Sequence, residues 1–286
     1  MSARLPAWRS LLYVPANAPR FIEKAHLRGA SALILDLEDS VPDADKSAAR
    51  DGLGNAVAVL GQGGADVLVR INRPLDMAVR DVEAAVREGV AGLVLTKVDG
   101  ASHVRLLDEL VGELELERGV AAGAIRFLVV IETPRAWLEM EGIFVASPRN
   151  VAALLGSEDF SLACDSAPAD ETLLLPKQQL IITARAHGLM PLGLIASVAD
   201  FSDEQKLRAM AGRSRRFGFA GATCVHPTQV RIVNEAFAPS AEELERARRL
   251  VALYEEAAAD GRGAVRFEGA MVDAPVVARA RRLLTL

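Results

Sequence analysis

Apolar segments alternate with amphipathic segments along the chain, and this alternation predicts the architecture. Eight short runs are rich in Val, Ile and Leu, and a stretch with helical spacing of apolar positions follows each of them. Because the runs are almost continuously apolar, we expect parallel strands that are covered on both faces. The predicted strands are Arg9–Pro15, Ala32–Glu38, Asp66–Asn72, Gly92–Lys97, Arg126–Glu132, Val151–Gly156, Met190–Ile195 and Ala222–Val225.

The intervening stretches predict eight helices. They are Pro19–Arg28, Asp45–Leu60, Asp76–Glu88, Ser102–Glu117, Thr133–Phe144, Glu171–His187, Asp203–Phe217 and Ser240–Ala259. Eight strand–helix units in about 260 residues favour a closed (β/α)8 TIM barrel, since an open doubly wound sheet usually has fewer strands. The predicted fold class is therefore α/β, with a TIM-barrel catalytic domain over residues 1–260.

The last part of the chain exceeds what a barrel needs. Asp260–Gly263 is a turn-forming break, and Ala264–Leu286 adds a short segment with a helix of its own. We expect residues 261–286 to form a C-terminal helical extension.

Composition excludes several classes of protein. The 286 residues include 33 Lys and Arg against 38 Asp and Glu, so a net charge of −5 argues against binding to nucleic acid. Cys164 and Cys224 are too few for a disulfide framework, and the first residues lack the features of a signal peptide. No uncharged stretch reaches the roughly 18 apolar residues of a membrane helix. We expect a cytoplasmic protein that does not bind membranes.

Polar residues follow the predicted strands at the end where a barrel builds its active site. Glu132 and Asp159 end neighbouring strands, which lie about 4.8 Å apart, so their carboxylates could share one cation. Two hard oxygen ligands favour Mg²⁺, or Mn²⁺, over zinc, for which the sequence has neither clustered His nor CxxC spacing. The alternative is a pair of solvated rim carboxylates that meet neighbouring Arg or Lys side chains.

Arg70 interrupts an otherwise apolar strand, where a charge is costly unless it meets an anion. It could bind a substrate carboxylate or enolate, or form a buried ion pair with Glu38 or Asp39, and both can hold at once. His226 ends the eighth strand. The other three histidines lie in helical stretches and are predicted to be surface residues: His26, His103 and His187.

Six motifs in a fixed order carry a resemblance that covers nearly the whole chain. They are Arg9–Asn17, Leu35–Val41, Val69–Asn72, Ile131–Pro134, Gly156–Phe160 and Val225–Pro227. Together they resemble the citrate lyase beta-subunit-like family of the HpcH/HpaI aldolase/citrate lyase superfamily. The resemblance implies a TIM barrel that hosts malyl-, citramalyl- or citryl-CoA lyases and a malyl-CoA thioesterase.

The resemblance also implies roles for individual residues. Glu132 and Asp159 match positions that hold Mg²⁺, Arg70 matches the arginine that faces the 2-oxo acid, and Glu38 and Asp39 match an acidic pair in the same site. Four further residues match positions around the CoA thioester arm and phosphates: Tyr13, Lys24, Val225 and His226.

The segment Gly269–Pro275 looks like the family's lid, whose aspartate, here Asp273, reaches a neighbouring subunit as acid or base. This implies a homo-oligomer, a trimer or hexamer.

Some positions depart from the family's pattern. Lys177 stands where the family has an arginine, Gly193 where an aspartate is usual, and Thr96 where a proline precedes the lysine. Ala18 and Gly221–Ala222 also differ. The metal and oxo-acid positions are intact, whereas the CoA positions match less completely.

The sequence thus predicts a Mg²⁺-dependent carbon–carbon lyase that cleaves a 3-hydroxyacyl-CoA into an acetyl-type CoA and a 2-oxo acid. The alternatives are an acyl-CoA thioesterase, a CoA-independent 2-oxo-acid aldolase and a noncatalytic complex subunit. The combination of Glu132, Asp159 and Arg70 argues against the last, because a scaffold needs no metal pair.

Overall fold

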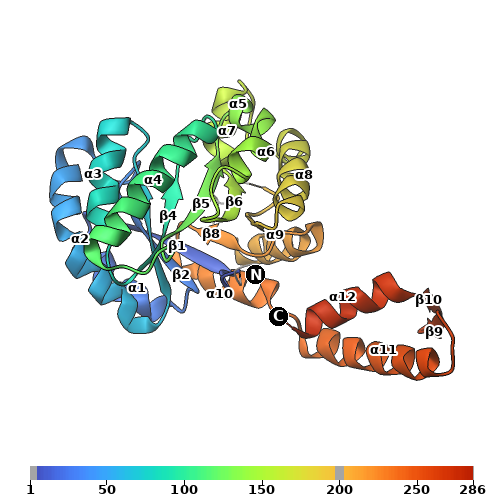
Figure 1. The fold of residues 1–286 in the computed structure, drawn as a ribbon. Helices are drawn as coiled ribbons and strands as arrows, with labels where there is room; N and C mark the ends of the chain where they lie inside the picture. Colours follow the sequence, from blue (N-terminus) through green and yellow to red (C-terminus); the bar gives the residue numbers. More distant parts are fainter. Residues whose placement is uncertain (1–4, 197–202, 286) are drawn as a thin grey trace. The chain divides into compact units, whose positions relative to one another are not determined.

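Eight parallel strands form one sheet that closes on itself. The computed structural model describes residues 5–196 and 203–285, and within these ranges the strands lie in the order β7-β6-β5-β4-β3-β2-β1-β8 (Figure 1). They are β1 (Ser10–Pro15), β2 (Ala32–Asp36), β3 (Asp66–Ile71), β4 (Val90–Leu95), β5 (Arg126–Ile131), β6 (Asn150–Leu155), β7 (Met190–Leu192) and β8 (Ala222–Cys224).

The two ends of this sheet meet at Gly221, immediately before β8. Its carbonyl accepts a hydrogen bond from the Gly193 amide at 2.8 Å, and the Ala220 amide donates to the Pro191 carbonyl at 2.9 Å. A Cβ on Gly221 would lie 2.3 Å from the Trp8 carbonyl oxygen, so only glycine fits this close backbone approach. The predicted barrel is confirmed as an eight-stranded sheet that is nearly closed.

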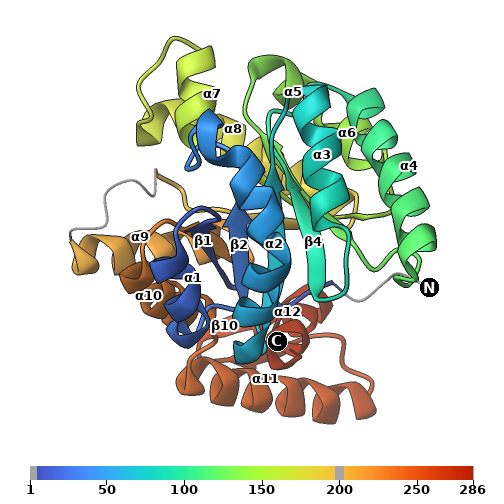
Figure 2. The ribbon, with the colours of Figure 1, turned by 90° about the vertical axis from the view of Figure 1, so that its left-hand side faces the viewer.

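Helices surround the outside of the strands (Figures 1 and 2). They are α1 (Pro19–Ala25), α2 (Lys46–Leu60), α3 (Leu75–Ala85), α4 (Ala101–Arg118), α5 (Pro134–Leu138), α6 (Met140–Phe144), α7 (Ser157–Ala163), α8 (Asp170–Ala186), α9 (Glu204–Phe217) and α10 (Pro227–Phe237). Short 3₁₀ turns lie at His26–Arg28, Asp43–Asp45 and Gly61–Gly63. No helix in the described part of the chain is long and apolar enough to span a membrane.

Alternation along each strand separates two apolar layers and positions the polar residues. One face of the strands packs inside the barrel, where Ile34, Leu68 and Val130 belong to the same buried cluster. The other face packs against the helices in a second, larger cluster. Because side chains repeat every two residues, Asp36 continues the interior face of Ile34, and Arg70 continues that of Leu68.

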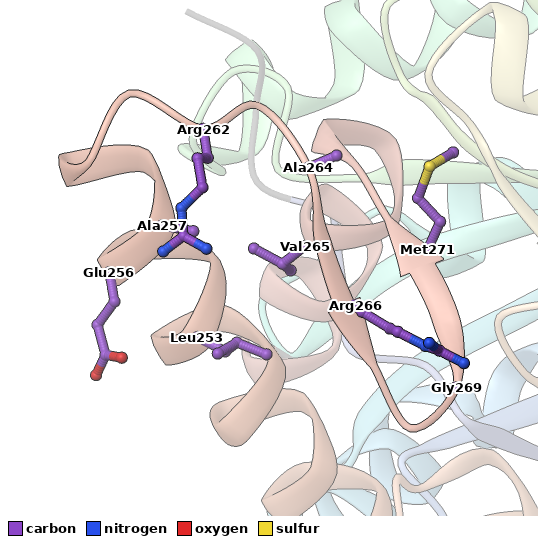
Figure 3. A pocket seen from close by; sticks show the side chains of 9 residues that line it. All are labelled: Leu253, Glu256, Ala257, Arg262, Ala264, Val265, Arg266, Gly269 and Met271. Atoms are coloured by element: carbon purple, nitrogen blue, oxygen red, sulfur yellow. The ribbon is translucent and has the colours of Figure 1, made fainter.

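Residues 238–286 form a second compact unit. It contains α11 (Ala241–Ala259), the antiparallel hairpin of β9 (Val265–Phe267) and β10 (Ala270–Val272), and α12 (Ala274–Leu284). Its own small core includes Leu250, Phe267 and Val277. This unit has a concavity of about 650 Å³. Figure 3 shows side chains of α11 and the hairpin that line it, such as Leu253 and Val265.

The structure corrects three details of the predicted elements. Ser240–Ala259 is not the eighth barrel helix, because α11 packs against α12, and the unpredicted α10 packs against α9 and β1 instead. The compact units therefore divide between Phe237 and Ala238, earlier than the boundary expected at residue 260. The predicted helix Thr133–Phe144 is split because Glu139 leaves helical backbone angles.

The histidine and cysteine predictions have mixed outcomes. His103 is buried with 8% of its surface exposed, so its assignment to the surface was wrong. It lies on a face of α4 that also buries Val104 and Leu107. Burial lowers the pKa of His103 to about 4, and the nearby Arg73 contributes. Both cysteines are free, as expected.

Candidate functional site

Arg70 is the centre of a charged cluster at the carboxyl ends of the strands. Its Nε and Nη2 atoms donate to Asp36 Oδ1 and Oδ2, each at 2.6 Å, in a bidentate pair between neighbouring residues of β2 and β3. Its Nη1 lies 2.9 Å from Glu38 Oε2. Burial raises the pKa of Asp36, but the hydrogen bond and charge of Arg70 outweigh it, so the pKa lies below its usual value. Arg70 therefore forms the ion pair that one interpretation expected, and the other interpretation, binding of a substrate anion, would add to it.

The guanidinium keeps donors for a further anion. Arginine has five N–H groups, and the hydrogen bonds to Asp36 engage two of them. The contact of Nη1 with Glu38 Oε2 is an ion pair without a hydrogen bond. Its side chain remains 15% exposed, and it lines a cavity. The Tyr13 ring lies under the guanidinium, with Cζ 4.9 Å from the ring centroid, and orients it further. Burial raises the pKa of the Tyr13 hydroxyl, which stays protonated at neutral pH.

Lys97 links Glu38 and Asp39 to Glu132. Its Nζ contacts Glu38 Oε1 and lies 3.2 Å from Asp39 Oδ1. Its backbone amide donates to Glu132 Oε2 at 2.7 Å. Lys97 has a φ of 48°, a left-handed conformation that is uncommon for a residue other than glycine and that often occurs at functional sites.

Glu132 extends from β5 across Gly156, which directly follows β6. A Cβ on Gly156 would lie 2.5 Å from Glu132 Cγ, so the bare backbone makes room for this carboxylate. Burial raises the pKa of Glu132 to about 7, and the charges of Glu38 and Asp159 add to this effect. Asp159 lies in the first turn of α7 and is half-buried. The two carboxylates therefore repel each other at adjacent strand ends.

This arrangement has the chemistry of a small cation site. Among the described residues, neither Glu132 nor Asp159 forms an ion pair with a basic side chain, although Asp36, Glu38 and Asp39 do. Residues 5–196 and 203–285 contain no group of three or more Asp, Glu, His or Cys that could hold a metal on its own. Two carboxylates that leave other positions to water and substrate suit Mg²⁺, which retains waters and prefers oxygen ligands.

The cavity above the barrel interior has a volume of about 350 Å³. Its polar lining includes Tyr13, Asp36, Arg70, Glu132 and Asp159, and its apolar lining includes Val130, Leu154, Leu155, Leu194 and Val225.

A second layer of polar groups holds the β2 end of the site in place. The buried Lys46 Nζ donates to the carbonyls of Leu37 and Glu38 at 2.9 and 2.8 Å, and to Asn72 Oδ1 at 2.8 Å. Asn72 in turn donates to the fully buried Asp81. This network fixes the backbone that carries Glu38.

The structure brings together most, but not all, of the residues predicted for the site. Arg70, Glu38 and Asp39 cluster, and Val225 lines the same cavity. Lys24 is exposed on α1 and does not line the cavity, and His226 bonds to the Thr228 hydroxyl at 2.8 Å just beyond β8.

One predicted residue and two residues missing from the predicted site remain. Asp273 lies in the second unit, at the N-terminus of α12. Asp36 and Lys97 were not among the predicted site residues. Their position at the ends of apolar strands was the available signal.

Comparison with known proteins identifies the family of the chain. Residues 9–227 match the model of the HpcH/HpaI aldolase/citrate lyase family. The chain belongs to this family. It is 30% identical over 282 residues to citrate lyase subunit beta of Leuconostoc mesenteroides, covering 97% of this chain and 92% of that one. It is 32% identical to a (3S)-malyl-CoA thioesterase of Cereibacter sphaeroides, covering 99% and 96%.

A solved structure extends the comparison to the whole fold. The chain is similar to protein CitE from Mycobacterium tuberculosis in complex with magnesium, acetoacetate and coenzyme A, with a TM-score of 0.78 and 29% identity. The similarity covers 98% of both chains. The expectation of an enzyme from a family of carbon–carbon lyases is confirmed at the level of the family.

We predict that Glu132→Gln stabilises the metal-free protein at pH 8. The folded-state pKa of Glu132, about 7, exceeds its ordinary value of 4.5, so its contribution to stability is lost as pH rises through that interval. Removing the charge should therefore raise the free energy of unfolding by on the order of 1 to 3 kcal/mol at pH 8. Added Mg²⁺ should raise the melting temperature of the wild type more than that of the variant. Thermal melts with and without Mg²⁺ measure both effects.

Glu115→Gln provides a matched control at another buried glutamate. Burial raises the pKa of Glu115, but hydrogen bonds from Arg149 and two backbone amides outweigh it, so the pKa lies below its usual value. This variant should be destabilised and should keep the full response to Mg²⁺. A Glu132→Gln protein that melts lower than wild type at pH 8 and responds normally to Mg²⁺ would contradict the assignment.

Proposed function

We propose that the protein is a Mg²⁺-dependent lyase that cleaves a 3-hydroxyacyl-CoA of the malyl, citramalyl or citryl type. The products are an acetyl-type CoA and a 2-oxo acid. The observation that carries this proposal lies around one cavity: an arginine with spare donors, and two carboxylates that have no cationic partner within residues 5–196 and 203–285. The arginine suits a substrate carboxylate, and the pair of carboxylates suits a divalent cation.

Glu132 and Asp159 are the residues that would hold Mg²⁺. Their charges leave the cavity with excess negative potential, which an anionic substrate would not enter without a cation. When bound, Mg²⁺ supplies Lewis-acid polarisation of a substrate oxygen. The magnesium complex of the similar CitE protein supports this assignment.

Arg70 binds the carboxylate of the 2-oxo acid and stabilises negative charge on the neighbouring oxygen. In the cleavage direction, the substrate hydroxyl gives its proton to water and becomes a carbonyl, and the proton taken up later at the thioester carbon balances this loss. The adjacent carbon–carbon bond breaks, and its electron pair passes to the carbon beside the thioester. Asp36 and Glu38 hold the guanidinium in advance of the reaction, so little reorganisation is needed when charge develops. Glu38 and Asp39 complete the acidic side of the site and orient Lys97.

The thioester carbon must then gain a proton, and we assign this step to Asp273 of a neighbouring subunit. In this assignment, residues 261–286 act as a lid in a homotrimer or hexamer. Tyr13, Lys24, Val225 and His226 are assigned to the CoA side of the site. Val225 and Tyr13 line the cavity, which supports their part of the assignment.

An acyl-CoA thioesterase is the second candidate, and the 32% identity to a (3S)-malyl-CoA thioesterase favours it specifically. Hydrolysis of the thioester would release free CoA. A CoA-free aldolase would instead act on hydroxy-oxo acids alone.

The decisive assay incubates the protein with Mg²⁺ and each of malyl-, citramalyl- and citryl-CoA, and identifies products by mass spectrometry. We expect acetyl-CoA and a 2-oxo acid, with turnover abolished by a chelator. Arg70→Lys should lower kcat/KM about a hundredfold or more, because lysine keeps the charge and loses the bidentate fork. Arg149→Lys is the control, since Arg149 forms a bidentate pair with Glu115 and is not part of the cavity lining. Free CoA as the product would identify a thioesterase, and unimpaired turnover by Arg70→Lys would refute the mechanism.

The assignment of Asp273 to a partner's site predicts complementation between inactive variants. Asp273→Asn and Arg70→Lys should each be inactive alone. Coexpressed as mixed oligomers in equal amounts, they should regain about a quarter of wild-type activity, because that share of sites combines an intact barrel with an intact lid. Mixed oligomers without recovered activity would exclude action between subunits.

A further inference from the structure

One wall of the cavity follows β7, where the backbone beyond Gly193 has no strand partner among the described residues. β7 ends at Leu192, and the next residues contribute Gly193, Leu194 and Ala196 to the cavity lining. β3 and β7 lie four strands apart in the closed ring of eight, so this wall faces Arg70 across the barrel mouth. The wall is apolar, whereas the Arg70 side is charged.

The buried ammonium of Lys177 holds this wall from behind. Lys177 lies on α8 and is 1% exposed. Its Nζ donates to three consecutive carbonyls, those of Leu194 at 2.7 Å, Ile195 at 3.2 Å and Ala196 at 3.2 Å. The three donors of one ammonium group therefore satisfy three carbonyl groups that a longer strand would have paired within the sheet.

Ser214 on α9 holds the same segment through its amide. The Ile195 amide donates to Ser214 Oγ at 2.9 Å, and this hydroxyl donates to the Met210 carbonyl at 2.7 Å. Ser214 is fully buried. Side chains from two helices thus fix three carbonyls and one amide of this segment.

Burying an ammonium costs free energy unless its hydrogen bonds are satisfied. Here the three carbonyl acceptors satisfy them. Burial lowers the pKa of Lys177 to about 8, while Asp170 and Glu158 oppose that effect. At neutral pH the group therefore remains mostly charged. An apolar side chain could fill the same space, but only a side chain with several N–H donors can hold three carbonyls.

We infer that Lys177 and Ser214 are positioning residues that fix the apolar wall at Leu194 and Ala196 against the acyl-thioester part of the substrate. This inference rests on the proposed function, since it assigns the two sides of the same cavity to two parts of the proposed substrate. The carboxylate head of the substrate meets Arg70, Glu132 and Asp159, and the part bearing the thioester lies along the opposite, uncharged wall. Neither positioning residue touches the substrate.

The chain offers a matched comparison in Lys46. This lysine is also buried and also donates to consecutive carbonyls, those of Leu37 and Glu38, but on the charged side of the cavity. Lys177→Met and Lys46→Met remove the same donors and keep side-chain length, so they should affect opposite parts of the site.

Binding to the Mg²⁺-loaded protein tests the inference, with acetyl-CoA and pyruvate as separate probes in calorimetry. Lys177→Met should raise the Kd of acetyl-CoA about tenfold or more and leave that of pyruvate within about twofold. Lys46→Met should show the reverse preference. Lys177→Arg, which keeps charge and donors, should recover most of the acetyl-CoA affinity. In turnover, Lys177→Met should raise KM more than it lowers kcat.

Hydrogen exchange of the ligand-free variants tests the wall directly. Lys177→Met should speed exchange of the amides at 193–196 without changing those at 36–40. Should Lys177→Met fail to fold, Ser214→Ala, which removes one hydrogen bond from the wall, should give the same pattern with a rise in acetyl-CoA Kd of about threefold.

The outcomes separate this inference from the proposed function. Wild-type protein that binds pyruvate with Mg²⁺ but neither binds nor cleaves any CoA thioester would overturn the proposed function, and with it the assignment of the wall to the thioester. Wild-type protein that binds acetyl-CoA, with Lys177→Met and Ser214→Ala unchanged in acetyl-CoA affinity or weakened equally for both probes, would overturn the inference alone.

Discussion

The pair between Arg70 and Asp36 is the interaction on which the rest of the site depends. A guanidinium placed in an apolar barrel interior requires carboxylates, and Asp36 and Glu38 provide them from the neighbouring strand. Glu38 then requires a second cation, which is Lys97, and the backbone of Lys97 positions Glu132. The contacts follow one another from Asp36 to Glu132, and neither Glu132 nor Asp159 forms an ion pair with a basic side chain among the described residues.

The barrel explains why these residues meet. Alternation along parallel strands places every second side chain inside, and the strand order brings the carboxyl ends of β1 to β6 around one mouth. The short β7 breaks this regularity, and side chains of α8 and α9 replace the missing strand pairing. The site thus has one side fixed by a network of charges and another fixed by hydrogen bonds from buried side chains to the backbone.

Much of this could be predicted from the sequence, because apolar strands followed by polar residues reveal both the barrel and its active end. Arg70, Glu132 and Glu38 were predicted to belong to the site on that basis and lie in one cluster. Asp36 could have been found by alternation, since it shares a face with Ile34. The position of Lys97 just after β4 was a similar signal, but its left-handed backbone and its link to Glu132 exist only in the folded chain.

The assignment of the last barrel helix shows a different limit. α10 and α11 are both amphipathic, and only tertiary packing decides that the first covers β1 and the second packs against α12. A local pattern cannot make that choice. Similarly, helical spacing places Lys177 and His103 on the apolar faces of their helices, but only the folded structure shows that these polar side chains are buried there.

The most direct test of the central claim is a crystal structure of the protein with Mn²⁺ and pyruvate, located by the anomalous signal of manganese. Our account predicts one manganese ion bound by the carboxylates of Glu132 and Asp159, with the pyruvate carboxylate within hydrogen-bond distance of Arg70. Manganese bound elsewhere, or pyruvate in this cavity without contact to Arg70, would contradict it.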